Sequence, residues 1–92
     1  MDVYAQIAER IIKSQEAIIG PVAIEQASLV HNLSVDWDAH QISIDGNAPK
    51  VLEDLVKQYR NLFGQISVEV SKEAVGSLAS QLPPNGLPSV LK

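Results

Sequence analysis

The sequence contains no cysteine, which excludes disulfides, thiolate metal sites and cysteine nucleophiles. Threonine is also absent, and the aromatic residues are only Tyr4, Trp37, Tyr59 and Phe63. Neither a glycine-rich phosphate-binding motif nor the G-x-S-x-G motif of serine hydrolases occurs. We therefore expect a protein that is not an enzyme and that needs no cofactor.

Clusters of basic residues and long apolar runs are missing as well. The seven lysines and arginines are scattered among eleven acids, and the net charge is −4. Proteins that bind a phosphate backbone normally gather their bases on one face, so we expect no nucleic-acid partner. The apolar runs are too short for a membrane span, and the N-terminus begins with an acid instead of the bases of a signal peptide. These features predict a cytoplasmic protein without a membrane partner.

The length of the chain allows one small domain. Its 92 residues are too few for two independent cores, although 46% of them are apolar. Three prolines and a glycine in the last ten residues, PPNGLPSVLK, indicate an irregular segment. We predict a single domain over residues 1–82 and an extended tail over residues 83–92, in which Leu87, Val90 and Leu91 are candidate partner contacts.

Apolar residues recur every three or four positions from Val3 to Ile18, which predicts an amphipathic helix. The helix should end near Gly20, because glycine suits a helix C-terminus and Pro21 cannot continue the hydrogen-bond ladder. A second, shorter helix then follows over PVAIEQASLV. A single helix kinked at Pro21 is the alternative.

From Leu33 onward the apolar residues alternate with polar ones, which predicts a β-hairpin with one buried face. The expected inward set is Leu33, Val35, Trp37, Ile42 and Ile44, with a turn around DAHQ. After the hairpin, Asn47 is a plausible N-cap and Pro49 suits the first turn of a helix. That helix should run to the next glycine, Gly64.

The stretch IIGPVAIEQ at 18–26 has an echo 44 positions later, LFGQISVEV at 62–70. Aligning residues 7–30 with 51–74 gives four identities, Glu9/Glu53, Lys13/Lys57, Gly20/Gly64 and Glu25/Glu69. The echo favours a helix after Gly64, whereas the alternation of Ile66, Val68 and Val70 favours a strand. We predict an α+β fold of helix pair, two-stranded antiparallel hairpin, helix pair and proline-rich tail, with a possible internal duplication of the helix–Gly–helix unit.

The cluster DWDAH is the one local group with a chemical character. On a continuous strand, Asp36, Asp38 and His40 would share a face and could hold a divalent ion, with His31 nearby in the chain. Aspartate and histidine are also ordinary turn residues, and the turn itself should break the alternation. We therefore assign no metal ligand and leave this question open.

The segment ISIDGNAPKVLEDLVKQY at 42–59 resembles the final strand and helix of KH-type RNA-binding domains. That family clamps nucleic acid with a G-x-x-G loop between two helices. The place of such a loop is taken here by IIGP, which lacks the second glycine and a base, so we assign no family.

Elimination leaves an interaction module as the predicted function. We expect a small regulatory or adaptor protein that binds a protein partner or itself, most simply as a homodimer that covers the apolar helix faces. A small-molecule sensor is the alternative, with Trp37, Tyr59 and Arg60 lining a pocket between the hairpin and the helices. A nucleic-acid-binding domain of KH-like or helix-turn-helix type is the third possibility, weakened because VAIEQASLV carries no Lys or Arg.

Overall fold

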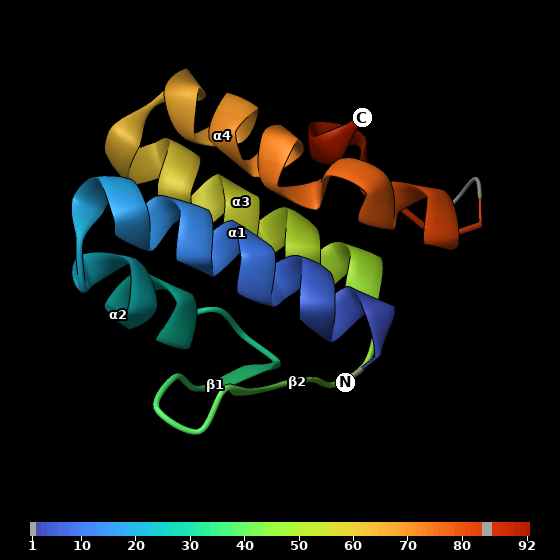
Figure 1. Cartoon of the computed structure of the whole chain (residues 1–92), viewed down its shortest axis with the longest axis horizontal. Coiled ribbons are helices and arrows are strands. Elements are labelled where there is room, and N and C mark those ends of the chain that lie inside the picture. Colours follow the sequence, from blue (N-terminus) through green and yellow to red (C-terminus); the bar gives the residue numbers. More distant parts are fainter. Residues whose placement is uncertain (1, 84–85) are drawn as a thin grey trace.

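The computed structural model describes residues 2–83 and 86–92. Its elements are α1 (Val3–Ile19), α2 (Val22–Ser28), β1 (Leu33–Asp36), β2 (Gln41–Ile44), α3 (Ala48–Phe63), α4 (Gln65–Val75) and the 3₁₀ turns η1 (Gly76–Gln81) and η2 (Ser89–Leu91). This is the predicted order of helix pair, antiparallel hairpin and helix pair (Figure 1). The predicted α+β fold class is therefore confirmed.

The first helix pair is separated by a glycine corner. At the start of α1, the Asp2 carboxylate accepts a hydrogen bond from the backbone N–H of Ala5 at 3.0 Å. At its end, Gly20 has φ +76° and donates its N–H to the carbonyl of Glu16. Pro21 follows and α2 begins at Val22. The two helices are distinct, so the alternative of one kinked helix is wrong.

The hairpin alternates as predicted, but its turn begins one residue earlier. Leu33 pairs with Ile44 and Asp36 with Gln41, so residues 37–40 form the turn. The N–H of His40 donates to the carbonyl of Trp37 at 3.1 Å, which places Trp37 in the turn instead of at a strand end. Leu33 and Ile42 are buried, whereas the serines and polar residues of the opposite face are exposed.

The second helix pair repeats the corner of the first. Asn47 caps α3 by accepting from the N–H of Lys50 at 3.1 Å, and proline lies in the first turn, as predicted. Gly64 has φ +86° and joins α3 to α4. Because residues 65–75 are helical, the alternative of a strand at 66–70 is wrong. The helix buries Ser67, Val68, Ser71 and Val75, which are spaced by three and four residues.

The helices cover one another more than the hairpin covers them. Helix α1 contacts α2, α3, α4 and β2, while α4 packs on both α1 and α3 (Figure 1). The hairpin lies on the other side, with β2 against α1 and β1 against α2. The core consists of Ala5, Ile7, Ala8, Ile11, Ile12, Ala23, Ala27, Val30, Leu33, Ile42, Val51, Leu52, Leu55, Val56, Tyr59, Val68, Val75, Leu78 and Leu91. Most of the apolar helix surface is therefore already covered within one copy of the chain.

The C-terminal segment returns to the helices. Residues 84–85 of the predicted tail lie outside the described residues. In the described part, η2 packs against α3 and α4, and Leu91 is only 5% exposed. Leu87 and Val90 are partly buried against the core. Across residues 2–83 and 86–92, no helix combines the length and the apolar character that a bilayer span requires.

Candidate functional site

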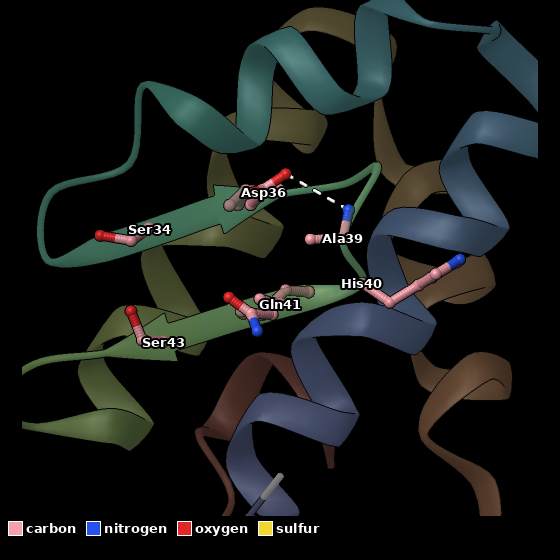
Figure 2. Close-up of a pocket in the computed structure, with 8 residues that line it drawn as sticks. Ser34, Asp36, Ala39, His40, Gln41 and Ser43 are labelled. Atoms are coloured by element: carbon pink, nitrogen blue, oxygen red, sulfur yellow. Dashed lines mark hydrogen bonds between the residues drawn. The ribbon is translucent and has the colours of Figure 1, made fainter.

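The structure does not assemble the trio Asp36, Asp38 and His40 into a metal site. The carboxylate of Asp36 accepts a hydrogen bond from the N–H of Ala39 at 3.3 Å, and so closes the hairpin turn. His40 points away from it toward α1, where its Nδ1 lies 3.9 Å from a carboxylate oxygen of Glu9 (Figure 2). In the part of the chain that the structure describes, no group of three or more His, Asp or Glu side chains could hold a metal ion.

An open hollow lies along the hairpin (Figure 2). It is lined by Ser34, Val35, Asp36, Ala39, His40, Gln41, Ile42 and Ser43. Its polar side chains are exposed to solvent, and water therefore weakens any charge that they could stabilise. A binding pocket normally encloses its ligand and aims a few buried polar groups at it. The residues that line the hollow supply no such groups, so it does not qualify as a catalytic or ligand site.

The three residues proposed to line a pocket have separate roles. Tyr59 is fully buried, and its hydroxyl donates to the carbonyl oxygen of Ala23 at 2.6 Å. Trp37 is partly buried in the hairpin turn, with its ring centre 6.3 Å from that of His40. Arg60 is exposed in the last turn of α3. None of the three lines the hollow, and Tyr59 contributes to packing.

Two groups have raised pKa values, one a buried phenol and the other the exposed lysine of an ion pair on α3. Burial raises the pKa of the Tyr59 phenol, because the charged form would lose its hydration. The pKa of Lys50 is raised first by its 2.7 Å hydrogen bond to Asp54 and then by the charge of that carboxylate. A perturbed pKa marks a functional site when several such groups converge in a cleft, which these two do not.

Two buried hydrogen bonds tie the helix pairs together at equivalent positions. Gln15 of α1 donates through Nε2 to the carbonyl oxygen of Ser67 in α4 at 3.1 Å. Tyr59 of α3 donates to the carbonyl oxygen of Ala23 in α2. Tyr59 follows Gln15 by 44 positions and Ser67 follows Ala23 by 44, the same offset as the sequence echo. The first helix of each pair therefore bonds the second helix of the other pair.

This reciprocity gives the fold an approximate two-fold arrangement. Under the 44-residue offset, the contact of α1 with α4 corresponds to the contact of α3 with α2, and both contacts are present. The internal duplication of the helix–Gly–helix unit stays a prediction, because matching contacts do not show that the two units share an origin.

Of the five large apolar side chains that are exposed among the described residues, four lie at the two glycine corners and the fifth, Leu29, lies at the end of α2. Ile18 is 61% exposed, Leu62 52%, Phe63 37% and Ile66 66%, and all four lie within two residues of Gly20 or Gly64. Both corners lie at the same end of the molecule, at the left of Figure 1. We call Ile18, Leu62, Phe63 and Ile66 the apolar end. Large apolar side chains that are exposed together at one end of a molecule are a candidate interaction site.

Comparisons with known proteins add no assignment: no family model matches the chain, and no curated protein or solved structure shows significant similarity to it. The candidate site therefore rests on the geometry of the chain itself.

The sequence marks the two corners that form the apolar end, but it does not show which apolar side chains beside them are exposed. IIGP and LFGQ mark two corners, and a corner alone does not show which apolar side chains are buried. Ile19 and Val22 are partly buried, whereas Phe63 and Ile66, which follow them by 44 positions, are exposed. Which of these side chains is exposed depends on how the two helix pairs pack against each other.

Proposed function

We propose that the protein is a non-enzymatic protein–protein interaction module of regulatory or adaptor type, and that it binds through the apolar end. The observation that supports this is the exposure of four large apolar side chains at the two corners. Interface cores are enriched in such side chains, and a few anchors supply most of the binding free energy.

The local structure favours this role for the corners. Each corner turns at a glycine with positive φ, and a Cβ added at either glycine would meet no atom within 4 Å. The space beside each corner glycine is therefore open, and a partner can reach the flanking apolar side chains. The small-molecule alternative would instead need Trp37, Tyr59 and Arg60 to line one pocket, whereas the hollow in the structure has other lining residues.

The test compares charged substitutions inside and outside the apolar end. Leu62→Lys and Ile66→Glu replace two of its residues with charges that suit a helix C-terminus and N-terminus, respectively, so the fold should persist. Leu29→Lys is the matched control, because Leu29 is 70% exposed at the end of α2 and lies outside the apolar end.

Partners captured from native cell extract are identified, purified and titrated against each variant by calorimetry. We expect Leu62→Lys/Ile66→Glu to weaken binding at least about 30-fold, as the loss of interface anchors does, and Leu29→Lys to bind like the native chain. Undiminished binding of every partner and of the chain itself by the double variant would refute the proposal.

A further inference from the structure

The two corners at the apolar end are related by the same 44-residue offset as the buried hydrogen bonds. Leu62 follows Ile18 by this offset and both are exposed, whereas Phe63 and Ile66 follow the partly buried Ile19 and Val22. Residues 17–24 and 61–68 contain no charged side chain. The apolar end therefore consists of two uncharged corners, of which the Gly64 corner supplies most of the exposed apolar surface. A two-fold interface between identical copies can place the larger corner of each copy against the smaller corner of the other.

The charges beside the corners are opposite at equivalent positions. Glu16 precedes Gly20 by four residues and Arg60 precedes Gly64 by four. Among the described residues, neither side chain has an ion-pair partner. Glu16 also lies in the last turn of α1, where the helix dipole disfavours a negative charge and no basic residue compensates it. A positively charged side chain of a partner could pair with Glu16, and a negatively charged one could pair with Arg60.

We propose that a second copy of this chain occupies the apolar end, with the Gly20 corner of each copy against the Gly64 corner of the other. This inference rests on the proposed function and specifies its partner. In this arrangement Glu16 of each copy meets Arg60 of the other, twice per dimer, and the apolar corners meet between them. The alternative two-fold arrangement, Gly20 corner against Gly20 corner, would bring like charges together, which weakens association.

The small number of residues at the apolar end limits the interface. A standard stable interface uses roughly 20–30 residues on each partner. The apolar end and its two flanking charges supply far fewer exposed side chains, so we expect a weak and reversible dimer. Sedimentation velocity over a wide concentration range measures such an equilibrium.

Charge reversal tests the proposed pairs. Glu16→Arg alone and Arg60→Glu alone each convert two attractions into two repulsions, and we expect dimerisation to weaken roughly tenfold or more. The double variant Glu16→Arg/Arg60→Glu should dimerise like the native chain. Mixing the two single variants should also restore association, because one carries two positive charges and the other two negative ones. Circular dichroism checks that each variant stays folded.

Cross-linking tests which corners meet, and the absence of cysteine makes the chain a clean background. Ala17 and Asn61 are exposed, adjoin the apolar end and are 44 positions apart. We expect a mixture of Ala17→Cys and Asn61→Cys chains to cross-link with a short bis-maleimide, whereas each variant alone should cross-link poorly. Efficient cross-linking of either variant with itself would overturn the proposed arrangement. Ser34→Cys, on the exposed face of β1, is the control for random collision.

The outcomes separate this inference from the proposed function. A chain that stays monomeric up to about 1 mM, a concentration at which even weak pairs associate, overturns the inference. The proposed function survives that result if a purified partner still depends on Leu62 and Ile66. Self-association that is unchanged by the charge variants and by Leu62→Lys/Ile66→Glu would also overturn the inference, because the dimer would then use another surface.

Discussion

The first helix pair, α1–α2, and the second, α3–α4, bond each other at equivalent positions with side chains of different size. In the second pair, the fully buried Tyr59 reaches the carbonyl of Ala23 with its hydroxyl. In the first pair, the shorter Gln15 reaches Ser67 with Ser71 as an additional partner. At both positions a buried side chain donates a hydrogen bond to a carbonyl of the neighbouring helix, although the two side chains differ in volume.

The comparison predicts unequal losses when the two donors are truncated. Tyr59→Ala removes a fully buried aromatic ring and should reduce the free energy of unfolding by ~3–5 kcal/mol. Gln15→Ala leaves the hydrogen bond from Ser71 to Ser67 in place, and the loss should be about 1–3 kcal/mol. Urea unfolding followed by circular dichroism measures both.

Lys13→Ala is the control for these two substitutions, since an exposed side chain with no ion-pair partner among the described residues should change stability by less than about 0.5 kcal/mol. If Gln15→Ala lowered the free energy of unfolding as much as Tyr59→Ala, the larger buried volume of Tyr59 would not explain its greater expected contribution.

The two corner glycines should respond alike to substitution. Gly20 and Gly64 have φ values of +76° and +86° with extended ψ, a region that side chains avoid, and an added Cβ would meet no neighbouring atom. Gly20→Ala and Gly64→Ala should therefore each lower the free energy of unfolding by about 1–3 kcal/mol through backbone strain alone. Thermal unfolding of both variants tests this, and a large difference between them would show that one corner has a constraint that the other lacks.

Tyr59→Phe isolates the hydroxyl from the ring. Loss of one buried hydrogen bond should lower the free energy of unfolding by about 1 kcal/mol at neutral pH. Because burial raises the pKa of Tyr59 above its ordinary value of 10.0, the folded chain keeps the phenolic proton after the unfolded chain has lost it. The contribution of this proton to stability is therefore complete below pH 10 and declines above it.

Unfolding in urea between pH 8 and 11 should show a steeper alkaline decline for the native chain than for Tyr59→Phe. Parallel profiles would mean that the phenol is ionised as easily in the folded chain as in the unfolded one.

The smallest effect is expected where the two corners differ in sequence. Pro21 occupies the first corner and Gln65 the second, and both follow a glycine of similar conformation. Proline suits the first turn of a helix, so Gln65→Pro should change the free energy of unfolding by less than about 0.5 kcal/mol. The substitution removes the exposed hydrogen bond from the side-chain amide of Gln65 to the Glu69 carboxylate, which contributes little to stability in water. A loss above ~1 kcal/mol would show that the N–H of Gln65 is needed, as the rule for proline describes.

The sequence predicted the elements well because each depends on local chemistry. Asn47 with Pro49, and Gly20 with Pro21, are short-range signals for the start and end of helices. The conflict at residues 66–70 was decided by the echo, since the alternation of Ile66, Val68 and Val70 fits a strand as well as one side of a helix. Trp37 was misplaced by one position because a four-residue turn begins where a longer strand was expected.

The tertiary features were not accessible in the same way. Gln15 looks like a surface residue in the helical pattern, yet it is 1% exposed because α4 covers it. The helix faces on which the sequence predicts a homodimer are covered by α4, and the exposed apolar surface lies at the corners instead. Which apolar residues stay exposed is decided by distant segments, so periodicity alone could not predict the site.

The hairpin is the covalent connection between the two helix pairs, which pack against each other through α1 with α4 and α2 with α3. Because this connection is covalent, the association of the two pairs is intramolecular, and their mutual affinity need not match that of free chains. The side chains between the pairs therefore need not give the tightest possible interface. An amide, Gln15, and an aromatic ring, Tyr59, can accordingly occupy equivalent positions in one fold.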